Sequence, residues 1–222
     1  DKCKNSFSNI DLEHRYNYIH FDLANRIAEA AAKRNPGIGI ATLAYDDTLG
    51  YPDPKILKLQ PNLAVQMCLG IHSWAHPFVY SWQHKAYKDW IDNEAAKRPL
   101  FVWTYMLEPY DDAMRLYKYG AFFPALYPWR AARIYKEFAR DGVRGCFIEV
   151  NPVFHLLEAY VALKMCFDPS IDTDRLIDEY FELYYGAAAG PMRRFYKTLE
   201  DITWNPKNYP EPEMRTLFQN KI

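Results

Sequence analysis

The sequence lacks the patterns that would assign it to several large functional classes. No Gly-rich phosphate-binding loop follows any apolar run, so a nucleotide-binding sheet has little support and we expect no cofactor. No apolar run approaches the roughly 18 residues that a membrane span needs. The formal net charge is -1, which gives no electrostatic reason to expect nucleic acid or an anionic membrane as a partner.

Cysteine is also scarce, with four residues and no C-x-x-C pair. Cys68 and Cys146 lie inside apolar runs, which is typical of buried free thiols rather than of a disulfide framework or a zinc site. His72 and His76 have the spacing of a helical metal-binding pair. Because breakers flank this segment, we do not expect it to be helical, and we expect no metal. Contacts to sugar hydroxyls or plain loop packing are better explanations of these two side chains.

Aromatic side chains are abundant, at 17% of 222 residues, with 18 Tyr and 6 Trp. Rings with a polar group often line sugar-binding clefts, but they also fill ordinary cores, so carbohydrate is a mild indication only. Half of the residues are hydrophobic, which is enough for one large domain or a domain with an appendage. The chain begins without Met and shows no signal peptide, so we expect a mature product or a fragment.

Helices and strands alternate along the chain. The patterns predict strands over 38–45, 62–70, 100–107 and 145–150, and helices over 16–34, 84–98, 129–140, 156–165, 172–186 and 189–202. Continuously apolar strands between helices are typical of a parallel α/β sheet covered on both faces. The longest loops, 71–83 and 108–127, follow strands, as they do in a (β/α)8 barrel. Four strands make half of a barrel, or else a smaller open α/β sheet.

These residues also carry a family resemblance. The segments "IGIATLAYDDT", "LFVWTY", "DGVRGCFIE", "LLEAYVALKMCFDPSIDTDRLIDEYFELYYG" and "PMRRFY" resemble, in order, the uncharacterised bacterial family catalogued as domain of unknown function 4838. The resemblance covers most of residues 1–200. It implies a (β/α)8 TIM-barrel architecture similar to that of α-glucuronidases and β-N-acetylhexosaminidases, and a secreted or periplasmic location. It also implies an acidic residue between Trp103 and Tyr105, where this chain has Thr104.

With that architecture we expect three parts. Residues 1–153 form the second half of a barrel, 154–204 a helical extension packed on it, and 205–222 a tail. A lone half-barrel leaves two unpaired edge strands, so we expect the missing half or another chain to cover them. The carboxyl ends of barrel strands line one cleft, so candidate site residues lie there.

Glu149 closes the fourth predicted strand and is the main catalytic candidate. Its alternative is a structural ion pair with Arg130, Arg133 or Arg144. Glycoside hydrolysis needs a second carboxylate or a substrate acetamido group, and the candidates are Asp46, Asp47 and Glu108. Adjacent residues in a strand point to opposite sides, so at most one of the two Asp enters the cleft, and both could simply cap a loop.

Substrate-binding candidates are mainly aromatic. Trp103 and Tyr105 could stack on the C–H faces of a sugar, or Trp103 could simply fill a barrel core. The complete set of expected substrate-binding residues is Tyr45, Gln66, His72, Trp74, His76, Trp103, Tyr105 and Asn151. We expect a glycoside hydrolase acting on a poly- or oligosaccharide; the alternative is a non-catalytic carbohydrate-binding or structural barrel fragment.

Overall fold

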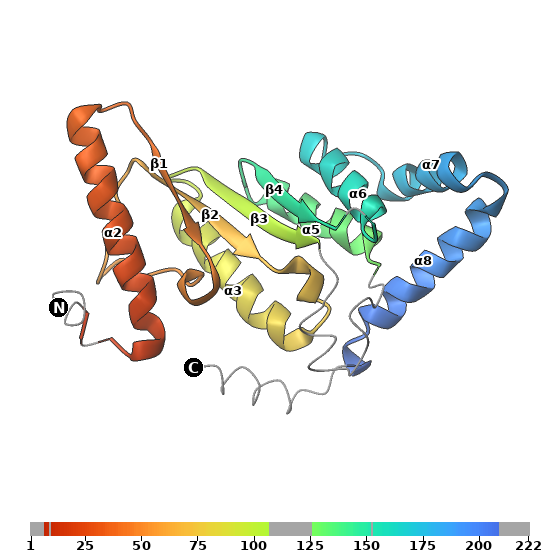
Figure 1. The fold of residues 1–222 in the computed structure, drawn as a ribbon, viewed down its shortest axis with the longest axis horizontal. Helices are drawn as coiled ribbons and strands as arrows, with labels where there is room; N and C mark the ends of the chain where they lie inside the picture. The colour runs from red at the N-terminus through yellow and green to blue at the C-terminus, as the bar shows by residue number, and fades with distance from the viewer. Residues whose placement is uncertain (1–6, 9, 107–125, 152, 209–222) are drawn as a thin grey trace.

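The computed structural model describes residues 7–8, 10–106, 126–151 and 153–208. Its centre is a four-stranded parallel sheet with β1 (Ile40–Ala44), β2 (Leu63–Leu69), β3 (Leu100–Met106) and β4 (Cys146–Val150) in sequential order. The four predicted strands are therefore confirmed, and so is the parallel α/β class. Within the described residues the sheet is not closed: β1 and β4 each pair with one neighbour and form the two edges (Figure 1).

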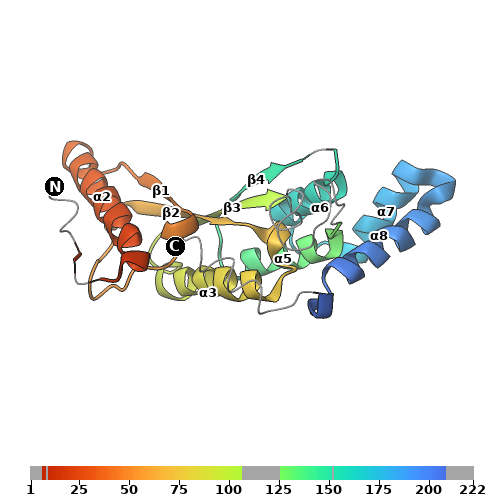
Figure 2. The ribbon, with the colours of Figure 1, turned by 60° about the horizontal axis from the view of Figure 1, so that its bottom comes forward.

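Three helices cover one face of the sheet: α2 (Leu12–Arg34), α3 (Pro77–Glu94) and α5 (Pro128–Arg140). Figure 2 shows α3 and α5 side by side under the strands. The ring of Phe21 on α2 lies 5.2 Å from that of Trp90 on α3, so α2 shares their core. Along β3 every second residue is buried, beginning with Leu100. The structure therefore corrects the expected two-sided cover, because the described helices seal one face only.

The helix α3 begins seven residues earlier than the sequence pattern predicts, at Pro77 rather than at His84. His76 is its N-cap, and the backbone N–H of Phe78 donates to His76 Nδ1 at 3.1 Å. Proline is favoured in the first turn because its missing N–H is not needed there. The segment expected to be an aromatic loop is therefore largely a short η2 turn (Ile71–Ser73) followed by a helix.

Three more helices follow β4: α6 (Leu156–Phe167), α7 (Thr173–Tyr185) and α8 (Ala189–Thr203). α6 packs on α5, and α7 and α8 form a hairpin at the end of the molecule opposite α2 (Figure 1). The ring centroids of Phe181 on α7 and Tyr196 on α8 lie 5.2 Å apart, so the two helices pack together through these rings. These helices confirm the predicted ones. No helix in the described ranges is long and apolar enough to cross a membrane.

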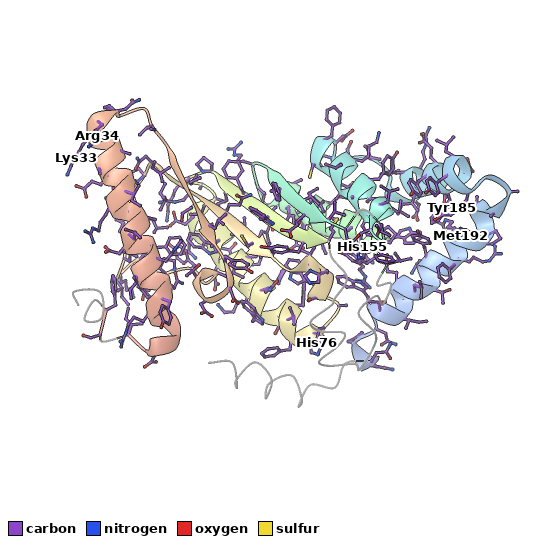
Figure 3. The ribbon with its side chains drawn as sticks, in the orientation of Figure 1. Lys33, Arg34, His76, His155, Tyr185 and Met192 are labelled. Atoms are coloured by element: carbon purple, nitrogen blue, oxygen red, sulfur yellow. The ribbon has the colours of Figure 1, made fainter. Side chains whose placement is uncertain are left out.

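Two buried carboxyl groups fix the start of α5. The backbone N–H of Tyr127 donates to Glu158 Oε1 at 2.7 Å, and that of Trp129 donates to Glu200 Oε2 at 3.0 Å. The first N–H groups of a helix have no partner within the helix, so these acceptors satisfy them. α6 and α8 are thereby bonded to one helix end, with His155 at the N-cap of α6 in the same region (Figure 3).

Candidate functional site

The sheet face that the described helices leave open carries most of the predicted site. Parallel pairing places Cys68, Trp103 and Phe147 in one row across the sheet, and Tyr105 beside Glu149 in another. Neighbours in a row share a face, and successive residues in a strand alternate between faces. On this face the residue Phe147 is 48% exposed, in contrast to the sealed face, where Val102 is fully buried. The site is therefore a solvent-facing aromatic surface.

Trp103 and Glu149 are in direct contact. The indole Nε1–H of Trp103 donates to Glu149 Oε2 at 3.1 Å, which fixes the carboxylate at the carboxyl end of β4. The ring of Phe147 packs on Trp103 with centroids 4.1 Å apart. Of the three arginines foreseen as alternative partners of Glu149, Arg130 and Arg133 instead lie 3.9 and 4.0 Å from Glu200. Glu149 is thus held by an aromatic N–H and remains half-buried.

Tyr105 connects the ends of three strands. Its ring centroid lies 6.4 Å from that of Tyr45 after β1 and 6.5 Å from that of His72 after β2. The Nδ1 of His72 lies 3.1 Å from the backbone oxygen of Tyr105. Burial is the largest cause that raises the pKa of the Tyr105 hydroxyl. It is also the largest cause that raises the pKa of the Cys68 thiol, to about 11. Both groups are therefore neutral near pH 7, and Cys68 is no thiolate nucleophile there.

Other predicted substrate-binding residues lie apart from this cluster. Trp74 is buried against α3 and α5, with its Nε1–H donating to Gln83 Oε1 at 2.7 Å and its ring 6.4 Å from that of Phe138. His76 is buried at the N-terminus of α3 (Figure 3). These two residues are parts of the helix layer, because the loop that was expected to carry them is mostly helical.

Gln66 and Asn151 lie at the margins of the cluster. Gln66 shares a row with Leu43 of β1, and its Nε2–H donates to the Val102 backbone oxygen at 3.4 Å. The backbone N–H of Asn151 donates to Met106 O at 3.1 Å, which continues the pairing of β3 with β4. Its Oδ1 accepts from Val153 N at 3.0 Å, so the side chain shapes the turn after β4.

The second carboxylate of the predicted pair is less fixed. Asp46 and Asp47 are both exposed in the short helix η1 (Asp46–Thr48), directly after Tyr45. Asp46 has a φ of 48°, a left-handed conformation that Asp adopts more readily than most residues. Glu108 lies outside the described residues. Two adjacent carboxylates therefore lie at the carboxyl end of β1, one of them on a residue with a left-handed backbone conformation.

The side chain of Thr104 lies on the opposite face of β3 from those of its neighbours Trp103 and Tyr105. Its side chain is fully buried on the helix side, where its hydroxyl bonds to that of Tyr135 on α5. An acidic side chain at this position, as the resemblance implied, would face the helices in this structure and not the aromatic face. Threonine here therefore removes no carboxylate from the cluster around Glu149.

Four residues of interest lie outside the predicted catalytic and substrate-binding sets. Phe147 and Cys68 belong to the aromatic face, where the alternation of side chains along β2 and β4 places them. The buried acids Glu158 and Glu200 gave no signal, because their partners are backbone N–H groups distant in sequence. Burial raises the pKa of Glu158 to about 8 and that of Glu200 to about 7. Their hydrogen bonds to the start of α5 give these two acids a structural role.

No group of three or more His, Cys, Asp or Glu side chains that could hold a metal ion occurs among the described residues. No curated protein matches the chain, and neither does any solved structure. One protein family does match, over residues 2–198, which is most of the chain. The chain therefore belongs to the family described as Domain of unknown function (DUF4838).

Proposed function

We propose that the open sheet face binds a poly- or oligosaccharide and that Glu149 takes part in hydrolysing it. The observation that carries this proposal is the hydrogen bond from Trp103 to Glu149. It holds a carboxylate beside an aromatic ring at the carboxyl end of a strand. The C–H faces of pyranoses stack well on such rings. Parallel sheets place their ligands at this end of the strands.

The sheet supports a barrel better than a doubly wound fold. In a doubly wound sheet the strand order reverses and helices cover both faces. Here the order is sequential, and the described helices α2, α3 and α5 cover one face (Figure 2). We therefore infer that these are four successive strands of a (β/α)8 barrel, whose inner face would be the open face of this sheet. The edges β1 and β4 are then the places where the remaining strands pair, whether they come from the same polypeptide or from another chain.

Glu149 is suited to general acid–base work. Its neighbours are the rings of Trp103 and Phe147, and a carboxyl group positioned at a strand end can act as a general acid or base on a bound substrate. The partner group is a second carboxylate, with Asp46, Asp47 and Glu108 as candidates, or an acetamido group of the substrate. A carboxylate separation of about 5 Å corresponds to retention of the anomeric configuration, and one of about 6.5–9.5 Å corresponds to inversion.

The test is hydrolysis of a panel of nitrophenyl glycosides by the complete natural polypeptide that contains these residues. Glu149→Gln keeps an oxygen for the Trp103 N–H but cannot transfer a proton, so we expect kcat to fall by about 100-fold or more with the circular dichroism spectrum unchanged. Glu182→Gln, on the exposed side of α7, is the matched control and should leave kcat unchanged. Full activity of Glu149→Gln contradicts the catalytic role.

A non-catalytic carbohydrate-binding fragment is the second candidate. Among the described residues, Glu149 is the one carboxylate hydrogen-bonded to the aromatic face, and hydrolysis needs a further group. This candidate predicts saccharide binding without turnover of any glycoside in the panel. Turnover that is abolished in Glu149→Gln favours the enzyme, and binding that survives in both forms without turnover favours the binding fragment.

A further inference from the structure

Two cysteines that are 20 positions apart in the sequence meet at the β4 edge of the sheet. Cys146 is the first residue of β4, and Cys166 lies in the last turn of α6. Both residues are exposed, whereas Cys68 is buried with 4% of its surface accessible. The expectation of a buried thiol at position 146 is therefore wrong, because β4 is an edge strand and no described strand covers its outer side.

The fold brings the two side chains to the same side of the sheet. Cys146 pairs with Val102, which is fully buried under the helices, so its side chain points to the helix layer and not to the aromatic face. α6 returns alongside β4 after the turn that follows it, and the two elements are in contact. The thiols of Cys146 and Cys166 lie close enough for each to affect the ionisation of the other.

The two thiols are not equivalent. The interaction with its partner is the first cause that lowers the pKa of Cys166 and raises that of Cys146. A thiol with a lowered pKa has the larger thiolate fraction and reacts first. Cys166 therefore has the character of an attacking thiol, with Cys146 beside it as the resolving one.

We propose that Cys146 and Cys166 are a redox pair that closes to an intrachain disulfide and so ties the edge strand β4 to α6. The oxidant class is a low-molecular-weight disulfide such as glutathione disulfide. The Cys166 thiolate attacks one of its sulfurs, forming a mixed disulfide and releasing one glutathione thiol. The Cys146 thiolate then attacks Cys166 Sγ and releases the second. The protein loses two electrons and two protons, and both appear in the two glutathione thiols.

This pair is independent of the proposed carbohydrate site. Cys146 faces the helix layer, while Phe147 and Glu149 on the same strand face the aromatic surface. A strand added at the β4 edge would bond to the backbone of β4 and leave the direction of the Cys146 side chain unchanged. The redox pair can therefore be tested whether or not the chain hydrolyses a sugar.

Peptide mapping of the full chain after incubation with glutathione disulfide tests the proposal. Free thiols are blocked with iodoacetamide, and the protein is digested with trypsin without reduction. Cleavage after Arg144, Lys164 and Arg175 separates the two cysteines into peptides 145–164 and 165–175. We expect these two peptides to be recovered linked, from protein that runs as a monomer on a non-reducing gel, and to separate after dithiothreitol. Cys68 serves as the internal control and should stay a thiol.

The variant Cys146→Ser gives the second arm. It removes the resolving thiol, so we expect glutathione to remain on Cys166 as a stable mixed disulfide, whereas the wild type passes through that state to the linked form. Three results would overturn the proposal: wild-type peptides that stay unlinked with both thiols alkylated, glutathione that persists on Cys166 in the wild type, or a linkage that joins two chains.

Discussion

Trp103 and Thr104 are adjacent in the sequence, yet their side chains lie on opposite faces of the sheet and have different partners. Trp103 lies on the open face and bonds to Glu149, while Thr104 is buried under α5 and bonds to Tyr135. Strand alternation alone separates the two roles. The same rule places Phe147 and Glu149 with Trp103, so the side chains that meet at this site follow from the register of three strands.

Glu158 makes the folded state sensitive to pH. Burial raises its pKa to about 8, whereas an ordinary glutamate has a pKa of 4.5. Between these values the folded chain binds more protons than the unfolded chain, so the free energy of unfolding falls as pH rises through this window. Glu158→Gln keeps an acceptor for the Tyr127 N–H but has no proton to lose.

We therefore expect the free energy of unfolding of the wild type to fall, relative to that of Glu158→Gln, by on the order of 3 kcal/mol between pH 5 and pH 8. Urea denaturation at the two pH values measures it. Glu200, with its pKa raised to about 7, contributes a slope of the same sign to both proteins. Glu182→Gln should retain the wild-type slope, and parallel pH curves for wild type and Glu158→Gln would contradict the argument.

The end of α3 is fixed to the entry of β2 by a buried ion pair. Arg98 donates to Glu94 and, through Nη1, to the backbone oxygens of Gln60 and Leu63 at 2.7 and 2.8 Å. Both side chains of the pair are 5% exposed. Removing one partner of such a pair leaves an uncompensated buried charge.

Arg98→Leu should therefore lower the free energy of unfolding by about 3–5 kcal/mol, as measured by chemical denaturation. Lys97→Leu is the matched control, since Lys97 Nζ lies 3.4 Å from the same carboxylate of Glu94 but its side chain is 61% exposed. We expect that change to cost less than about 1 kcal/mol. Equal losses in the two variants would show that the burial of Arg98 is not what matters.

The helices and strands could largely be predicted from the sequence, because their hydrophobic patterns are local. The start of α3 could not, since Pro77 was weighed as a helix breaker, whereas behind the His76 cap it begins the helix. The approach of Cys146 to Cys166 and the capping of α5 by Glu158 and Glu200 depend on tertiary packing. Sequence alone placed Glu149 at a strand end, but only the register showed its contact with Trp103.

At the scale of the whole molecule, the described part of the chain exposes an apolar sheet face bounded by two edge strands. Leu43 on β1 is 40% exposed on this face, and free edges of a parallel sheet bind further strands. We expect the isolated chain to self-associate, with a sedimentation coefficient that rises with protein concentration. Leu43→Lys should weaken that association, while Phe195→Lys on α8, a residue of comparable exposure, should not. Concentration-independent sedimentation of the wild-type chain would contradict this expectation.

The open aromatic face is proposed to bind carbohydrate. Calorimetric titration of the complete natural polypeptide with xylo-, cello- and chito-oligosaccharides tests it most directly, with Trp103→Ala and the matched control Tyr184→Ala, an exposed ring on α7. We predict that at least one of these saccharides binds the wild type, that Trp103→Ala raises its Kd by about tenfold or more, and that Tyr184→Ala leaves Kd unchanged. Binding to Trp103→Ala as tight as to the wild type, or no binding to the wild type, would contradict the claim.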